Sequence, residues 1–224
     1  MKMRFCTLFF VLNIFSFFPG VNHAKELLVP VTGQLQGYWC WVAVSQAVLD
    51  YNGIHLEQCS IVEWTLNQNG SGDITDVCEN PSAYNYSENP PGVEGILTNN
   101  GVPTTLPILR ALSFDEIKNE INNNNPIIRL TAWDGGAHYT VVRGYDDTNE
   151  VVHIMDPGGA GSYYSRTYTD AVNEGSVEWT RSMTTNSSPR LLVAVKSVLD
   201  MPVLMLTSAP TISISSILIP LLMK

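Results

Sequence analysis

The amino-acid sequence predicts an α+β fold in which helices come first and a sheet follows. Up to about residue 122, apolar residues recur at the spacing of amphipathic helices. Residues 127–133, 138–145 and 151–155 instead form short runs of β-branched, aliphatic and aromatic residues, which is typical of strands. Turn-forming residues at 134–136 and 146–149 separate these runs. The change of periodicity therefore falls near Pro126.

The strongest helix prediction covers residues 40–51. Its apolar face is formed by valines and an alanine, and the Asn52-Gly53 pair that follows is typical of a helix end. Weaker helices are expected at 56–66 and 93–99. The segment Ser113-Phe-Asp-Glu116 is a capping box, which predicts a further helix running to about Asn122.

The remaining segments predict connections and edges. Residues 67–91 are rich in Asn, Gly and Pro, so we expect a long loop there. Residues 25–33 predict an extended lead-in or edge strand, because Pro30 excludes a central strand. Two further weak strands are expected at 163–168 and 191–195.

Both ends of the chain are strongly apolar. Residues 1–24 combine a basic start, a short apolar run and a terminal Ala24, which predicts a signal peptide, with a retained anchor as the alternative. Residues 199–224 predict an apolar tail. One interpretation is a membrane anchor or a sorting tail, and the alternative is an extension that is disordered or packed onto the core. Residues 25–198 are then expected to form one domain, secreted or periplasmic, and membrane-associated only through the tail.

Charge and cysteine content exclude several classes of function. Without residues 1–24 the chain keeps 10 basic and 21 acidic residues, a net charge of −11, which argues against nucleic acid as a partner. No paired-cysteine spacing predicts zinc, and no cofactor is expected. Cys59 and Cys78 are candidates for a disulfide across the long loop. Cys40 then has no partner within the chain, so it is either a reactive thiol or one half of an intermolecular disulfide. The sequence leaves the oligomeric state open.

Cys40 is the candidate nucleophile because the helix start favours its thiolate form. Such a nucleophile needs a base, for which His138, His153 and His55 compete. We prefer His138, which begins a strand directly after Gly135-Gly136-Ala137. Asp156 ends the next strand, where it would orient His138 or serve only as a turn residue before Gly158-Gly159.

A donor for the oxyanion completes the hypothesis. Gln34 lies six positions before Cys40, and its amide could donate together with the backbone N–H of Cys40. Gln36 is the competing glutamine, and an ordinary loop role for Gln34 is the alternative.

These residues together resemble the papain-like cysteine peptidases, especially the compact bacterial branch with bacteriocin-leader-processing and secreted effector peptidases. The match consists of Gln34, Trp39-Cys40-Trp41, Gln58-Cys59, Cys78, Ser113–Glu116, Gly136–Val142, Gly144–Asp147 and His153–Gly158. The resemblance covers roughly residues 30–185. It implies a helical lobe led by the nucleophile helix, an antiparallel sheet lobe and a site in the cleft between them.

The resemblance further implies a triad of Cys40, His138 and Asp156, with Gln34 as oxyanion donor, acting on a peptide or protein. Ala137 departs from the glycine that is more usual before the histidine. Leader-processing relatives are fused to an exporter, so their Gly-Gly specificity is not transferred. The expected function is a secreted cysteine peptidase. Acyl transfer, cell-wall amidase activity and a catalytically silent binding module are the alternatives.

Overall fold

The computed structural model describes residues 23–70, 72–88 and 91–186. Four sequence-based predictions lie wholly or mostly outside these residues. They are the signal peptide at 1–24, the boundary of the domain at 198, the strand at 191–195 and the apolar tail at 199–224. None of the helices in the described part is long and apolar enough to cross a membrane.

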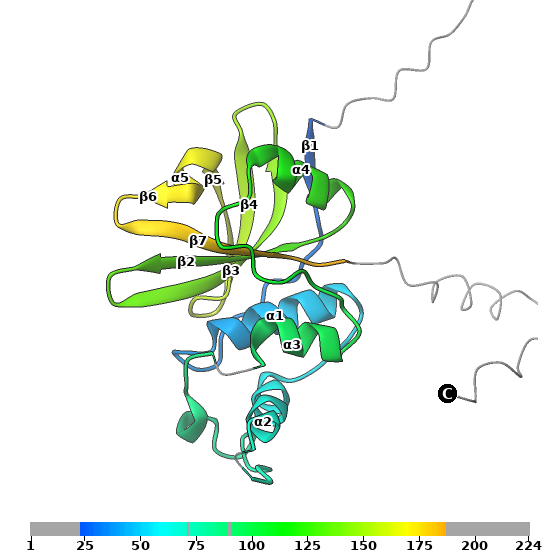
Figure 1. Ribbon diagram of the computed structural model, residues 1–224, viewed down its shortest axis with the longest axis vertical. Coiled ribbons are helices and arrows are strands. Elements are labelled where there is room, and N and C mark those ends of the chain that lie inside the picture. Colours follow the sequence, from blue (N-terminus) through cyan, green and yellow to red (C-terminus); the bar gives the residue numbers. More distant parts are fainter. Residues whose placement is uncertain (1–22, 71, 89–90, 187–224) are drawn as a thin grey trace, which may run out of the picture. The chain divides into compact units, whose positions relative to one another are not determined.

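The first half of the described chain is helical, as the sequence predicts (Figure 1). The helix that begins at Cys40 has the expected bounds, and the second helix begins two residues later than expected. The elements are α1 (Cys40–Tyr51), α2 (Gln58–Gln68), the 3₁₀ helix η1 (Pro81–Tyr84), α3 (Gly92–Asn99) and α4 (Phe114–Asn122).

Helix α1 lies at the centre of the packing. Its residues Trp41 to Ser45 and Ala47 to Leu49 are buried, so most of its circumference contacts other elements. It packs against α2, α3 and strand β3. A helix held on several sides is a rigid support for a residue at its first position.

The long loop before α3 is fastened to the helices at two places. Cys59 and Cys78 form a disulfide, as predicted, and it closes residues 59–78 onto α2. The buried indoles of Trp39 and Trp41 donate hydrogen bonds from their Nε1 atoms to the carbonyls of Tyr84 and Tyr86, at 2.9 and 3.2 Å. The loop therefore follows the start of α1 closely, despite its length.

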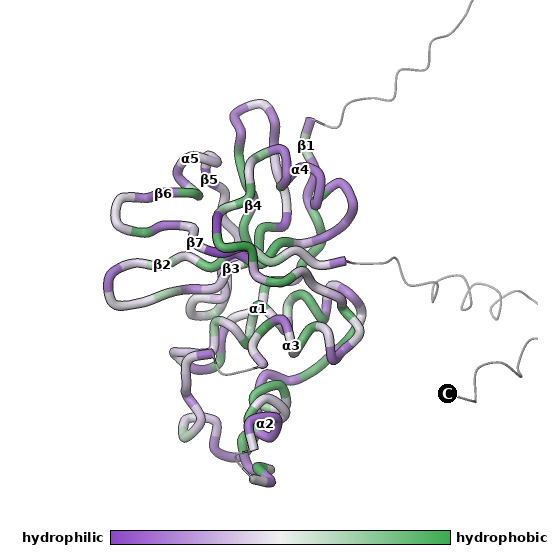
Figure 2. Tube along the Cα trace, viewed as in Figure 1, coloured by the Kyte–Doolittle hydropathy of each residue, from purple (hydrophilic) through white to green (hydrophobic). Residues whose placement is uncertain are grey.

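Six strands of the second half of the described chain form, together with β1 near its start, a seven-stranded antiparallel sheet. The strand order is β5-β4-β3-β2-β7-β6, and β1 pairs with β3. Figure 2 shows hydrophilic residues in the turns between strands and hydrophobic residues along the middle of the sheet. The strands are β1 (Ala24–Glu26), β2 (Ile127–Trp133), β3 (Gly136–Asp146), β4 (Val151–Asp156), β5 (Ser162–Thr167), β6 (Asn173–Glu174) and β7 (Val177–Thr184). The predicted α+β order is confirmed.

The predicted lead-in and the capping box are also observed. Residues 24–26 pair antiparallel with β3 as an edge strand, Ala24 opposite Asp146. The Ser113 hydroxyl accepts a hydrogen bond from the Glu116 N–H at 3.3 Å, and the Glu116 carboxylate accepts from the Ser113 N–H at 2.7 Å. This reciprocal pair satisfies two N–H groups at the start of α4.

The sequence failed to indicate β6, β7 and the short helix α5 (Tyr168–Val172). Strand β7 reads Val-Glu-Trp-Thr-Arg-Ser-Met-Thr, which lacks a run of apolar residues. It is nevertheless a central strand beside β2, and it buries Ser182 and Thr184 in contact with polar groups of the loop at 105–110. Ser182 and Thr184 can be buried because hydrogen bonds to this distant loop satisfy their polar groups.

Candidate active site

Cys40 is the first residue of α1 and has a free, half-buried thiol. Trp39 precedes it as the N-cap residue and supplies no side-chain cap. The first N–H groups of the helix, including that of Cys40, have no intrahelical partner and carry the positive end of the helix dipole. The thiol thus lies where an anion is stabilised and where a backbone N–H is free to bind one.

His138 and Asp156 meet at one edge of the sheet. His138 is near the start of β3, Asp156 is the last residue of β4, and β3 and β4 are antiparallel neighbours. The turn between them returns the chain to the same edge, and His138 Nε2 lies 2.7 Å from Asp156 Oδ1. This contact leaves Nδ1 of the imidazole as the nitrogen available to the thiol.

Two glycines shape the turn before His138. Gly135 has a φ of 92°, which favours glycine, and it forms the tight connection between β2 and β3. A Cβ atom on Gly136 would lie 2.7 Å from the Trp133 ring, so glycine permits the indole to cover the turn. The closest approach to Gly136 is thus made by a side chain of the preceding strand.

Asp156 makes the contacts expected for each of the two alternatives that the sequence left open. Its Oδ1 contacts His138 and also accepts a hydrogen bond from the Gly158 N–H at 2.8 Å. The turn after β4 therefore fixes the carboxylate that contacts the imidazole.

The competing histidines lie elsewhere. His153 points to the other side of β4, as strand alternation predicts, where its ring contacts Ser165 and Glu26. His55 is exposed and contacts Asp50. Of the three candidate bases, only His138 lies beside Cys40.

The charges around His138 favour an imidazolium. Burial lowers the pKa of His138, but hydrogen bonds with Asp156 and Cys40 and the negative charges of both groups raise it to about 9. Burial also raises the pKa of Asp156, yet the hydrogen bonds from His138 and from the Gly158 N–H hold it below its ordinary value. The pair is thus ionised over the neutral range.

The raised pKa of His138 makes stability depend on pH. Folded His138 keeps its proton up to about 9, whereas its pKa in the unfolded chain is about 6.5. Below about 8.5, the ordinary pKa of a thiol, the unfolded chain keeps a proton on Cys40 instead, so it binds as many protons as a folded pair of thiolate and imidazolium. The folded state binds more protons only near the upper value, and this stabilisation is lost as pH rises through about 9. We expect urea unfolding to show this fall in the free energy of unfolding from about pH 8 to 10.

The His138→Ala variant should lose this part of the pH dependence. His55→Ala, which removes an exposed histidine, is the matched control and should retain it. A wild-type curve that is flat over this range would contradict the proposed proton uptake by His138.

Gln34 lies beside Cys40 but is already hydrogen-bonded. Its Nε2 donates to the carbonyls of Gln36 and Gly37, at 3.0 and 2.7 Å, and so braces the turn that leads into α1. Its backbone N–H donates to the Pro157 carbonyl at 2.8 Å. A Cβ atom on Gly33 would lie 2.5 Å from the Ala160 carbonyl carbon, so this lead-in passes directly against the loop after Asp156.

A cavity of about 600 Å³ joins these groups. Gln34, Cys40 and His138 all line it, so the structure brings three of the four predicted site residues to one surface. Sequence reasoning missed the neighbours that shape the cavity: Tyr38, Glu88, Leu130, Trp133 and Tyr139. The helical half contributes Cys40 and the sheet contributes His138. No cluster of residues able to hold a metal ion occurs among the described residues.

A model of the Peptidase_C39 like family matches residues 26–186, more than half of the chain. The chain belongs to this family. It is accordingly a cysteine peptidase. The substrates of this C39-like peptidase are peptides or proteins. The family and the type of enzyme predicted from the sequence are confirmed.

The C39-like peptidase is also similar to a solved structure, the crystal structure of xylellain, a cysteine protease from Xylella fastidiosa. The two chains are 11% identical, and the match covers 74% of this chain and 86% of xylellain with a TM-score of 0.44. No curated protein matches the chain.

Proposed function

We propose that the C39-like peptidase hydrolyses peptide bonds with Cys40 as nucleophile, His138 as general base and acid, and Asp156 as the orienting group. The observation that carries this proposal is the 2.7 Å contact between His138 Nε2 and Asp156 Oδ1 at the cavity that Cys40 also lines. The contact orients the imidazole and stabilises its protonated form, which in turn stabilises a thiolate at Cys40.

The reaction follows from these positions. The Cys40 thiolate attacks the scissile carbonyl carbon, and the carbonyl oxygen becomes an oxyanion that the Cys40 N–H can bind. The C–N bond then breaks, and the imidazolium of His138 transfers its proton to the leaving amine. His138 next removes a proton from water, whose oxygen attacks the thioester. Cleavage of the C–S bond releases the acid and restores the thiolate–imidazolium pair.

Gln34 is the second proposed oxyanion donor. Its amide hydrogens are directed to the carbonyls of Gln36 and Gly37, so one of these bonds must be exchanged for the bond to the oxyanion. The exchange is local, because the donor and both acceptors belong to the turn that immediately precedes Cys40.

We further propose that the C39-like peptidase acts outside the cytoplasm, in the periplasm or after secretion. The basic start and apolar run of residues 1–24 support an export signal. The Cys59–Cys78 disulfide is a second support, because disulfides persist in oxidising compartments.

The test of the triad is the rate at which iodoacetamide alkylates Cys40 of the full chain at different pH values, read peptide by peptide by mass spectrometry to separate Cys40 from Cys6. A thiolate paired with His138 should react rapidly well below pH 8.5, the ordinary pKa of a thiol. The His138→Ala variant should react slowly until the pH approaches that value. Equal rates for the two proteins at neutral pH would exclude the proposed pair.

A further inference from the structure

A second, smaller cavity lies against the candidate active site. It measures about 100 Å³, whereas the active-site cavity measures about 600 Å³. Both cavities are lined by Glu88, Leu130 and Tyr139, so these three residues form a common wall. Tyr139 directly follows His138 in the chain. One of the three residues of this wall is thus the sequence neighbour of the proposed base.

The sheet register explains the position of this wall. Leu130 pairs with Tyr139 on one side and with Arg181 on the other, so their side chains form a row across three strands. Ile128 and Met183 are paired two residues further along the same strands. Both are buried, and the inner part of the small cavity is therefore apolar.

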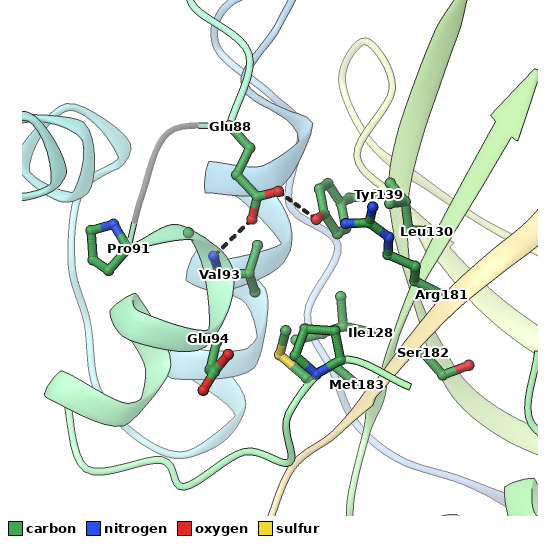
Figure 3. Close-up of a pocket in the computed structure, with 12 residues that line it drawn as sticks. Glu88, Pro91, Val93, Glu94, Ile128, Leu130, Tyr139, Arg181, Ser182 and Met183 are labelled. Carbon is green, nitrogen blue, oxygen red and sulfur yellow. Dashed lines mark hydrogen bonds between the residues drawn. The ribbon is translucent and has the colours of Figure 1, made fainter. Parts of the chain in front are cut away.

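Glu88 closes the wall from the helical side, as Figure 3 shows. One carboxylate oxygen, Oε2, accepts a hydrogen bond from the Tyr139 hydroxyl at 2.6 Å. The other, Oε1, accepts from the Val93 N–H at the start of α3, at 3.0 Å. A single side chain thereby joins the loop, helix α3 and strand β3, and both of its oxygens are used.

The neighbours of Glu88 suit this bridge. Burial, and then the nearby Glu88 charge, raise the pKa of Tyr139, so its hydroxyl keeps the proton that it donates. Gly92 has a φ of 66°, and a Cβ atom there would lie 2.7 Å from Glu88 Oε1. Glycine thus leaves room for the carboxylate to reach the helix start.

We propose that Glu88 is a positioning residue whose bridge between Val93 and Tyr139 separates the small cavity from the active site and so limits the size of the substrate side chain beside the scissile bond. This inference rests on the proposed function of Cys40 and His138. With the bridge in place, a substrate side chain meets the wall of Tyr139 and Glu88. Without it, the apolar space over Ile128 and Met183 becomes available.

The test uses the full chain and tripeptidyl chloromethyl ketones that carry Ala, Leu or Phe at the first or second residue from the reactive carbon. The rate of Cys40 alkylation by each probe is divided by its rate with iodoacetamide, which carries no side chain. In Glu88→Ala, the preference for Phe over Ala should increase about tenfold, because added apolar contact in an open pocket has effects of this size. Tyr139→Phe, which removes only the hydroxyl, should change the preference in the same direction.

Two further variants separate this role from a merely structural one. Glu88→Gln keeps the size of the side chain and can bond to both partners, so it should retain the wild-type preference. Glu94→Ala removes an acid that lines only the small cavity, and it should also leave the preference unchanged. A uniform loss of rate in Glu88→Ala, with the same preference, would overturn the proposal. Slow iodoacetamide alkylation in the wild type would instead contradict the proposed triad.

Discussion

Replacing Cys40 with alanine is expected to abolish peptide hydrolysis, with kcat/KM lowered by at least about 10⁴-fold. Alanine at the first position of α1 leaves no atom that can form the thioester, while the cavity, the helix start and the His138–Asp156 contact remain. The loss should therefore appear in kcat, with little change in the affinity for substrate. The measurement is cleavage of an unfolded protein substrate, such as reduced casein, followed by gel and mass spectrometry.

Two controls make this result specific. Cys6→Ala removes a different thiol and should leave hydrolysis unchanged, and the thermal unfolding midpoint of Cys40→Ala should stay near the wild-type value because the residue is small and half-buried. Hydrolysis that persists in Cys40→Ala and disappears on removal of another residue would assign the nucleophile elsewhere.

The second large effect is expected at Gln34. Gln34→Ala should lower kcat about 10²- to 10³-fold, with little change in KM, because an oxyanion donor acts in the transition state rather than in the bound substrate. Gln34→Glu should be at least as impaired, since a carboxylate cannot donate and repels the oxyanion. The measurement is steady-state hydrolysis of a fluorogenic peptide that the wild type cleaves.

Alkylation distinguishes this role from the bracing of the turn seen in the structure. Reaction of Cys40 with iodoacetamide displaces iodide and forms no tetrahedral oxyanion. If Gln34 is a donor, Gln34→Ala should alkylate at nearly the wild-type rate while hydrolysis falls. A parallel loss of both rates would show that Gln34 acts by holding the residues 36–37 that precede Cys40.

The elements that carry the proposed triad could be predicted because each has a local signal. Helix α1 has a continuous apolar face and an Asn-Gly end, and its observed bounds are the predicted ones. Strands β3 and β4 are joined by a short turn, and this hairpin by itself predicts that His138 and Asp156 lie at the same edge of the sheet. Alternation also correctly directs His153 away from Asp156.

The surroundings of the site could not be predicted because they depend on contacts between distant segments. Strand β7 has a mixed polar sequence and becomes central only because β2 and the loop at 105–110 pair with it. Glu88 is one polar residue in a long polar loop, and nothing local indicates that its carboxylate reaches β3. The bonds of the Gln34 amide were equally unpredictable, since a spacing of six residues does not determine where an amide points.

The lead-in before α1 has a consequence for the timing of assembly. Residues 24–26 pair with the far end of β3, and the Gln34 N–H and Gly33 lie against the loop after Asp156. This segment is synthesised early, and its partners are made more than 100 residues later. During synthesis, Cys40 therefore emerges long before His138, and contacts so distant in the chain form late in folding. Until the hairpin of β3 and β4 folds onto α1, the nascent chain lacks the imidazole that we propose as the base for Cys40.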